Sequence, residues 1–300
     1  MQLETHINTF GRHLKARFGT RVRKLSLHAG FTCPNRDGTL GRGGCTFCSV
    51  LSFNEGKAEQ PISVQMAARR AELTRATRYL AYFQAYTNTY AEVEELRRLY
   101  AEAVSHSDVV GLCVGTRPDC VPDGVLEILA GYRAQGYEVW LELGLQSAHD
   151  ETLQRINRGH GFAAYADAVA RARRFGVPVC AHLILGLPGE SEAMMRETHA
   201  RVLALGVEGI KLHPLMIVKG CSMAAQHARG EVAPPTLAAY AAIAADLIRR
   251  TPPEVIFHRV TATARPPTLI APDWCHTNFP AANAIAADLA TYGGQGCLVG

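Results

Sequence analysis

Val109-Val-Gly-Leu-Cys-Val-Gly-Thr116 is an apolar run that leads directly into the polar residues Arg117-Pro-Asp119. A short apolar run without polar alternation is typical of a strand buried on both faces, as in a parallel sheet covered by helices. A helical pattern follows at 123–135, and a second apolar run follows at 138–144. This order of strand, helix and strand predicts a βα repeat.

The same alternation extends in both directions from this unit. Further strands are expected at 24–28, 79–85, 177–186, 209–215 and 255–260, with helices at 63–77, 92–105, 162–175, 190–205 and 235–250. Six βα units without a G-x-G-x-x-G after the first strand favour a partial (β/α)6-type TIM barrel over a doubly wound sheet. We therefore predict an α/β barrel core at 1–217, which includes a basic N-terminal segment, and a C-terminal extension at 218–300 packed on the barrel.

The composition excludes several classes of protein. Of the 300 residues, 48% are apolar and 19% are charged, and no stretch approaches 18 uninterrupted apolar residues, so no membrane span is expected. The N-terminus lacks the basic and apolar regions of a secretory signal, which predicts a cytoplasmic protein whose nine cysteines are thiols or ligands. The basic run Arg12–Lys24 could follow RNA phosphates, although a solvated helix face is the commoner explanation of such a run.

Three cysteines bracket a glycine-rich loop after the first expected strand, in the pattern Cys33-x11-Cys45-x2-Cys48. Three thiolates on a [4Fe-4S] cluster leave one iron open to another ligand, whereas structural zinc needs four protein ligands. His28 could supply the fourth ligand of a zinc site, and a cluster that only transfers electrons is a second alternative. The count of three favours a cluster that binds a further molecule.

Several motifs resemble those of the radical S-adenosylmethionine (radical SAM) enzymes. They are the cysteine pattern, the segment Ile156-Asn-Arg-Gly-His160 and the turn Gly186-Leu-Pro-Gly-Glu190. More narrowly, the runs 30–39, 83–90, 115–120, 143–146 and 209–215 resemble the bacterial branch that includes YhcC and YtqA, and the resemblance extends from about residue 5 to residue 297. The long first cysteine spacing is similar to that of the related catalytic subunit of Elongator.

This resemblance implies a cofactor set and partners. Cys33, Cys45 and Cys48 would hold a [4Fe-4S] cluster, and SAM would chelate the fourth iron. An electron from a donor such as flavodoxin or ferredoxin would then split SAM and form a 5′-deoxyadenosyl radical. The substrate is not implied, and both RNA and a small anionic metabolite are open.

Candidate SAM ligands lie at the carboxyl ends of the expected strands, where barrels bind their ligands. Similarity to oxygen-independent coproporphyrinogen oxidase implies Gln146 and Arg158, although the first could cap its loop and the second could be a surface charge. Glu142 shares a strand face with Gln146 and needs a cationic partner such as Arg117 or Lys211, in a SAM contact or in a structural ion pair. Two weaker candidates complete this set: Gly186 and His182.

Candidate substrate ligands come from the third and sixth expected strands. Lys211 and His213 alternate with apolar neighbours, so both point to one face. Arg117 and Asp119 belong to a polar ring at the same end. We expect Arg117 and Lys211 to receive an anionic group of the substrate.

Overall fold

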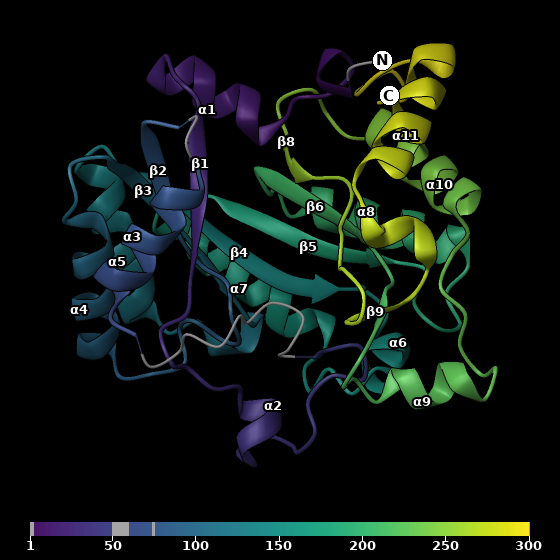
Figure 1. Ribbon diagram of the computed structural model, residues 1–300, viewed down its shortest axis with the longest axis horizontal. Helices are drawn as coiled ribbons and strands as arrows, with labels where there is room; N and C mark the ends of the chain where they lie inside the picture. The colour runs from purple at the N-terminus through teal and green to yellow at the C-terminus, as the bar shows by residue number, and fades with distance from the viewer. Residues whose placement is uncertain (1–2, 50–59, 74–75, 300) are drawn as a thin grey trace.

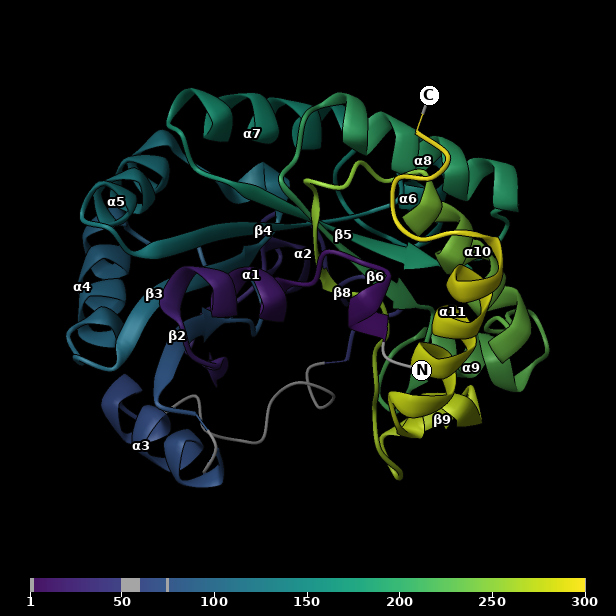
Figure 2. The same cartoon turned by 90° about the horizontal axis from the view of Figure 1, so that it is seen from above.

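A curled parallel sheet forms the centre of the protein. The computed structural model describes residues 3–49, 60–73 and 76–299, and its main sheet has seven parallel strands in the order β1-β2-β3-β4-β5-β6-β8. The strands are β1 (Val22–Leu27), β2 (Arg78–Phe83), β3 (Val109–Thr116), β4 (Glu138–Gln146), β5 (Val179–Leu185), β6 (Gly209–Pro214) and β8 (Ile256–Arg259). Figures 1 and 2 show that the sheet curls into a half-barrel. The predicted α/β fold with a partial barrel is confirmed.

Helices cover the convex face of this sheet. They are α3 (Ile62–Glu72), α4 (Val93–Val104), α5 (Asp123–Ala134), α7 (Phe162–Arg174), α8 (Glu192–Ala204) and α10 (Leu237–Arg249). Figure 2 shows them as an outer ring, and their apolar sides form one core with side chains such as Leu112, Leu141 and Ile210. All six predicted helices are confirmed. The helix expected at 63–77 ends earlier, at Glu72, and residues 74 and 75 lie outside the described residues.

One helix lies on the concave side, where none was expected. Helix α1 (Phe10–Phe18) lies within the curve of the sheet at the amino ends of the strands (Figure 2). Its Phe10 and Leu14, one turn apart, pack against Leu80, Trp140 and other inner-face side chains. The basic N-terminal segment is therefore also an apolar plug at this end of the half-barrel.

The remaining elements are shorter or belong to the second half of the chain. They are α2 (Pro34–Asp37), α6 (Asp150–Arg155), α9 (Met223–Ala228), α11 (Phe279–Tyr292), the antiparallel pair β7 (Ile217–Val218) and β9 (Leu269–Ala271), and 3₁₀ turns at Leu3–Thr5, Pro118–Cys120 and Asp273–His276. Helix α11 packs beside α10 (Figure 1). Among the described helices, none has the length and apolar character that a membrane crossing requires.

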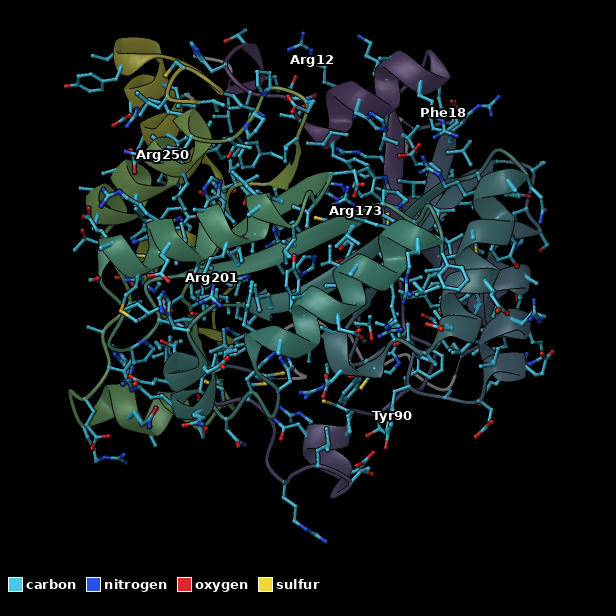
Figure 3. All side chains as sticks on the ribbon, turned by 180° about the vertical axis from the view of Figure 1, so that it is seen from behind. Arg12, Phe18, Tyr90, Arg173, Arg201 and Arg250 are labelled. Atoms are coloured by element: carbon cyan, nitrogen blue, oxygen red, sulfur yellow. The ribbon has the colours of Figure 1, made fainter. Side chains whose placement is uncertain are left out.

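The two ends of the half-barrel carry different segments. Helix α1 lies at the amino ends of the strands, and α2 lies at the carboxyl ends, as Figure 1 shows. In Figure 3 the labelled Arg12 of α1 and Tyr90, which follows β2, lie at these opposite ends. Because all seven strands are parallel, the loops that follow them meet near α2.

Candidate metal and cofactor site

The cysteine loop follows β1 and folds tightly around α2. Cys33 precedes the helix and its carbonyl accepts from Arg36 N at 2.8 Å, while Cys48 N donates to Cys45 O at 2.9 Å. Gly44 has a φ of +77°, and a Cβ there would lie 2.6 Å from Arg36 Nε. Only glycine therefore lets the Arg36 side chain cross the loop, where it donates to Cys48 O at 2.8 Å.

Guanidinium groups surround the three thiols. Arg158 Nη1 donates to Cys45 Sγ at 3.4 Å, and this thiol also lies 3.8 Å from Asn35 Nδ2. Burial raises the pKa of Cys48, while the nearby Arg36 acts in the opposite direction. Positive charge favours thiolates, which are the form that binds iron. The loop is therefore suited to a negatively charged metal cluster.

Several buried polar atoms at this end have no hydrogen-bond partner among the described residues. They are His28 Nε2, Thr46 Oγ1, Thr87 Oγ1, Arg158 Nε and His160 Nε2. Buried polar groups are nearly always paired, so a concentration of unpaired ones indicates a site for ligands or water. The residues present therefore fit a cluster with a polar molecule beside it.

The alternative of one zinc ion on the three cysteines and His28 is not favoured. In residues 3–49, 60–73 and 76–299, no three His, Cys, Asp or Glu side chains are arranged to hold a single metal ion. His28 Nδ1 accepts from Gly30 N at 3.0 Å, so the proton of the neutral ring lies on Nε2 and leaves no lone pair there for a zinc ion.

The structure brings together the two predicted SAM ligands, Gln146 and Arg158. Arg158 is buried, and its Nη2 donates to Gly144 O near the end of β4 while its Nη1 contacts Cys45. A Cβ on Gly144 would lie 2.9 Å from Gln146 Nε2 and 3.0 Å from Arg158 Nη2. Gln146 itself has a φ of +79°, a costly conformation for a residue with a side chain. Their binding of SAM stays a prediction.

Arg117 and Asp119 hold each other in a forked ion pair. The Arg117 Nε and Nη2 atoms donate to Asp119 at 3.0 and 2.7 Å, and Nη1 donates to Arg158 O at 2.8 Å. The pair therefore fixes the backbone of Arg158 beside the cysteines. Their predicted contact with substrate stays a prediction, and Arg117 is not a partner of Glu142.

Glu142 lies fully buried on the inner face and accepts from four side chains. Lys24 Nζ is at 2.5 Å, His182 Nε2 at 3.1 Å and His258 Nδ1 at 3.3 Å, and the fourth donor is Lys211 Nζ. Burial acts to raise the pKa of Glu142, but the ammonium groups of Lys211 and Lys24 outweigh it and hold this pKa well below its usual range. Of its two expected partners, Lys211 is present. No described contact tests whether Glu142 meets SAM.

The last candidates border this cluster. His182 bonds Glu142, and His213 Nδ1 lies 2.7 Å from Pro214 O on the same inner face. Gly186 has a φ of +90°, and a Cβ there would lie 2.9 Å from Pro235 Cδ. The glycine is therefore required for packing, and its role near SAM stays a prediction.

Sequence reasoning missed four residues of this region. Asn35 and Arg36 contact the cysteine loop, Gly144 makes room for Arg158, and Lys24 bonds Glu142. The first two stand directly after Cys33-Pro34, which is the signal that could have found them. Lys24 ends a basic run, and nothing in that run indicates a buried carboxylate as its partner.

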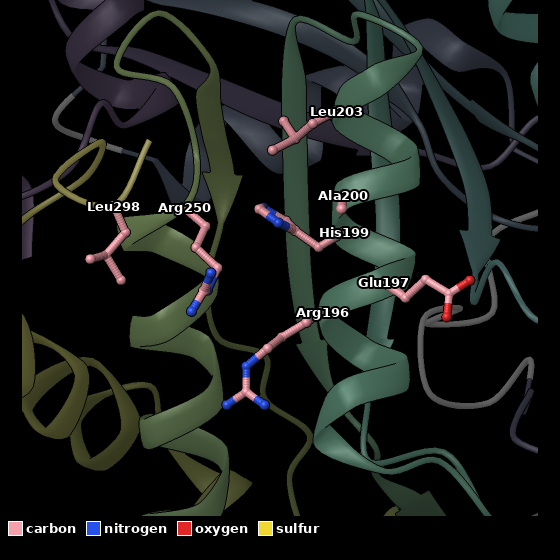
Figure 4. Close-up of a pocket in the computed structure, with 7 residues that line it drawn as sticks. All are labelled: Arg196, Glu197, His199, Ala200, Leu203, Arg250 and Leu298. Atoms are coloured by element: carbon pink, nitrogen blue, oxygen red, sulfur yellow. The ribbon is translucent and has the colours of Figure 1, made fainter. Parts of the chain in front are cut away.

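A separate cavity lies on the outer face, between α8 and α10 (Figure 4). Its polar residues are already paired: Arg196 donates to Asp246 at 2.7 Å, and His199 Nε2 lies 2.8 Å from Thr251 Oγ1. It is remote from the cysteine loop and offers no unpaired group of its own.

Comparisons with known proteins identify the class to which this chain belongs. Residues 33–202 match the radical SAM superfamily, and residues 207–291 match the radical SAM C-terminal domain. The chain therefore belongs to the radical SAM superfamily.

Curated relatives are similar to this chain over half or more of its length. YhcC of Escherichia coli K12 is 55% identical over 301 residues, which cover 100% of this chain and 97% of YhcC. YtqA of Bacillus subtilis is 39% identical over 97% of this chain and 91% of YtqA. A tRNA uridine(34) acetyltransferase of Dehalococcoides mccartyi is 29% identical, over half of this chain and a third of that protein.

A solved structure shares the fold at low sequence identity. Elp3 of Methanocaldococcus infernus has a TM-score of 0.64 at 18% identity, covering 90% of this chain and 63% of that one. At this identity the likeness supports the fold alone, which agrees with the half-barrel described above.

Proposed function

We propose that this chain is a radical SAM enzyme that holds a [4Fe-4S] cluster on Cys33, Cys45 and Cys48 and binds SAM beside it through Gln146 and Arg158. The observation that carries the proposal is the double contact of Arg158, which joins the Cys45 thiol to the carbonyl of Gly144 at the end of β4. When bound, the cluster and SAM would supply one-electron cleavage of SAM to methionine and a 5′-deoxyadenosyl radical.

The residues of the chain prepare and protect this site. Arg36 and Arg158 place positive charge next to the thiolates, and the Arg117–Asp119 pair holds the Arg158 backbone. At the other end, α1 fills the half-barrel and limits the approach of water to the inner face. Exclusion of water protects a reactive intermediate from side reactions.

Its partners would be a small electron donor and a substrate. We propose flavodoxin or ferredoxin as the donor, since the cluster needs one electron. For the substrate, the name of the tRNA-modifying relative supports RNA. The basic residues on α1, including Arg12, lie at the end opposite the cysteines (Figure 3), so they would not lead an RNA to the cluster. The observations therefore favour a small substrate over RNA.

Anaerobic reconstitution with iron and sulfide tests this proposal. We expect about four irons and four sulfides per chain, an EPR signal of the reduced cluster that changes on addition of SAM, and formation of 5′-deoxyadenosine. A cluster whose EPR signal does not change on addition of SAM would indicate an electron-transfer protein. A colourless protein with one bound zinc ion would contradict the presence of a cluster. A Cys297→Ser variant, which alters an exposed cysteine far from the loop, is the matched control.

A further inference from the structure

A layer of charged side chains crosses the inner face of the half-barrel below the cysteine loop. Lys24, Glu142 and Lys211 meet at its centre, and Tyr82 and His258 border them. We call these five residues the charged layer. It rests on the plug, since the His258 ring stacks on Phe10 at 3.9 Å.

The charged layer has more positive than negative charge. Two lysines share the single carboxylate of Glu142, and among the described residues no second acid contacts either ammonium. The Tyr82 ring lies 4.5 Å from Lys24 Nζ and 4.7 Å from Lys211 Nζ, and its hydroxyl accepts from Lys211 at 3.0 Å. An aromatic face stabilises a cation only in part, so about one positive charge is left without an anion.

Arg259 adds a second positive charge beside this layer. The β6–β8 register shifts by one residue, so that Lys211 is opposite Arg259, and the bulge brings both His258 and Arg259 to the inner side. Its charge acts on His182, His213 and Tyr82. Arg259 is exposed, and within the described part of the chain its side chain has no hydrogen bond or ion pair. A guanidinium in this position is free to bind an oxyanion.

Two imidazoles next to these cations present lone pairs rather than protons. His182 Nε2 donates to the Glu142 carboxylate and His213 Nδ1 donates to the Pro214 carbonyl, because neither of these oxygens can donate. Burial lowers the pKa of His182 to about 4 and that of His213 to about 3, so both rings are neutral. The second nitrogen of each ring is therefore a hydrogen-bond acceptor.

Part of the charged layer and its neighbour His182 are accessible to solvent. The Lys24 side chain is 21% exposed and the His182 side chain is 25% exposed, although Glu142 between them is fully buried. Glu142 and Gln146 are four residues apart on β4, a rise of roughly 13 Å along the strand. A molecule of metabolite size can span this distance between the charged layer and the proposed SAM site.

We propose that Lys24, Lys211 and Arg259 bind an anionic group of the substrate, a carboxylate or a phosphate, while His182 or His213 accepts a hydrogen bond from a neighbouring hydroxyl or amino group. This inference rests on the proposed function, since the bound molecule is taken to be the substrate of the radical reaction. Lys211 was predicted from the sequence to bind an anion, and the inference keeps that role. Arg117 was predicted with it, but Asp119 already neutralises Arg117. Lys24 and Arg259 therefore take its place.

Titration calorimetry of the full-length protein with two probes tests the site. Lactate and glycerol 3-phosphate each carry an anionic group and a hydroxyl, and both are added at constant ionic strength. We expect saturable binding of at least one probe, weakened tenfold or more in Arg259→Gln. Arg259→Lys should retain most of the binding because it keeps the charge. The matched control is Arg12→Gln, which removes one exposed positive charge of α1 that contacts no member of the charged layer, and this variant should bind like the unaltered protein.

The pattern of binding shows which kind of anion the charged layer and Arg259 accept. Binding of glycerol 3-phosphate alone identifies a phosphate site, binding of lactate alone identifies a carboxylate site, and binding of both identifies a general oxyanion site. Absence of saturable binding, or equal binding in Arg259→Gln, overturns the inference. SAM cleavage is measured separately on the same unaltered protein. Cleavage without anion binding overturns this inference alone, whereas anion binding without a cluster or SAM cleavage contradicts the proposed function instead.

Discussion

The two ends of the half-barrel are built in opposite ways. At the amino end, Phe10 and Leu14 of α1 fill the curve of the sheet, and the buried carboxylate of Glu138 is satisfied by His13, Arg17 and Trp140. At the carboxyl end, five buried polar atoms around the cysteine loop lack a partner among the described residues, against two toward the amino end, Arg70 Nε and His258 Nε2.

Backbone strain follows the same division. The non-glycine residues with positive φ in the described chain are Tyr86, Gln146 and Asn157, which follow β2, end β4 and follow α6. All three lie at the carboxyl end. Strain and unpaired polar groups persist only where the rest of the fold supplies enough stability to keep them. The plugged end therefore stabilises the fold, and under the proposed function the carboxyl end, called the open end below, would bind the ligands.

The largest expected effect is at the open end. Cys45→Ser should reduce SAM cleavage to background, because a serine hydroxyl is a poor iron ligand, while the free energy of unfolding of the metal-free protein changes by less than about 1 kcal/mol. Iron content, 5′-deoxyadenosine and urea unfolding measure these quantities. Cys221→Ser, at a buried cysteine of the second half of the chain, is the control. Full cleavage activity in Cys45→Ser would contradict the assignment of the cluster.

Glu142→Gln tests the charged layer between the two ends. The change leaves two ammonium groups beside a neutral amide, and loss of one partner from a buried ion cluster costs about 3–5 kcal/mol. Urea unfolding measures the loss. Glu192→Gln removes an exposed carboxylate paired with Arg196 and should cost at most about 1 kcal/mol. Equal losses in the two variants would show that the buried cluster adds no special stability.

Much of this architecture could be predicted from the sequence, and the exceptions have physical causes. Uninterrupted apolar runs such as 109–114 mark strands buried on both faces, so the parallel sheet and its helices were predicted correctly. Helix α1 was missed as a plug because its two buried apolar residues, Phe10 and Leu14, stand in a segment whose most prominent feature is its basic residues. The cysteine positions predicted the loop on which the proposed site is placed. The guanidinium contacts of Arg36 and Arg158, in contrast, depend on loops whose geometry no periodicity encodes.

Leu14→Ala tests the closed end. Deletion of this buried side chain of α1 should cost about 2–4 kcal/mol of unfolding free energy, because the rigid sheet around it cannot collapse into the space. SAM cleavage per folded molecule should change little, since the plug is remote from the cysteines. Leu40→Ala, at an exposed position, should cost less than about 0.5 kcal/mol. Loss of SAM cleavage in a folded Leu14→Ala protein would contradict the conclusion that the amino end serves stability and not activity.

The closed end should also respond to acid through His258. Burial lowers its pKa to about 3, against a usual value of 6.5, although the Glu142 carboxylate acts to raise it. The unfolded chain therefore binds a proton that the folded chain does not, and stability falls as the pH drops below 6.5, by at most about 1.4 kcal/mol per pH unit for this group. Unfolding between pH 7 and pH 5 measures this slope. His258→Gln, which keeps a donor for Glu142, should have a shallower slope; an unchanged slope would contradict the account.

The smallest effect separates strain from function at the open end. Gln146→Gly should stabilise the fold by up to about 1 kcal/mol, because glycine adopts a φ of +79° without steric cost. The same change should weaken SAM binding, measured from the EPR response of the reduced cluster, because the amide beside Arg158 is lost. Asn157→Gly is the matched control: its φ of +51° is also relieved, but Asn157 Nδ2 donates to Gly44 O at 2.8 Å, so no gain in stability is expected. A Gln146→Gly protein that is more stable and still binds SAM as tightly as the unaltered protein would contradict the role of Gln146 in SAM binding. The strained backbone at the end of β4 would then need another explanation.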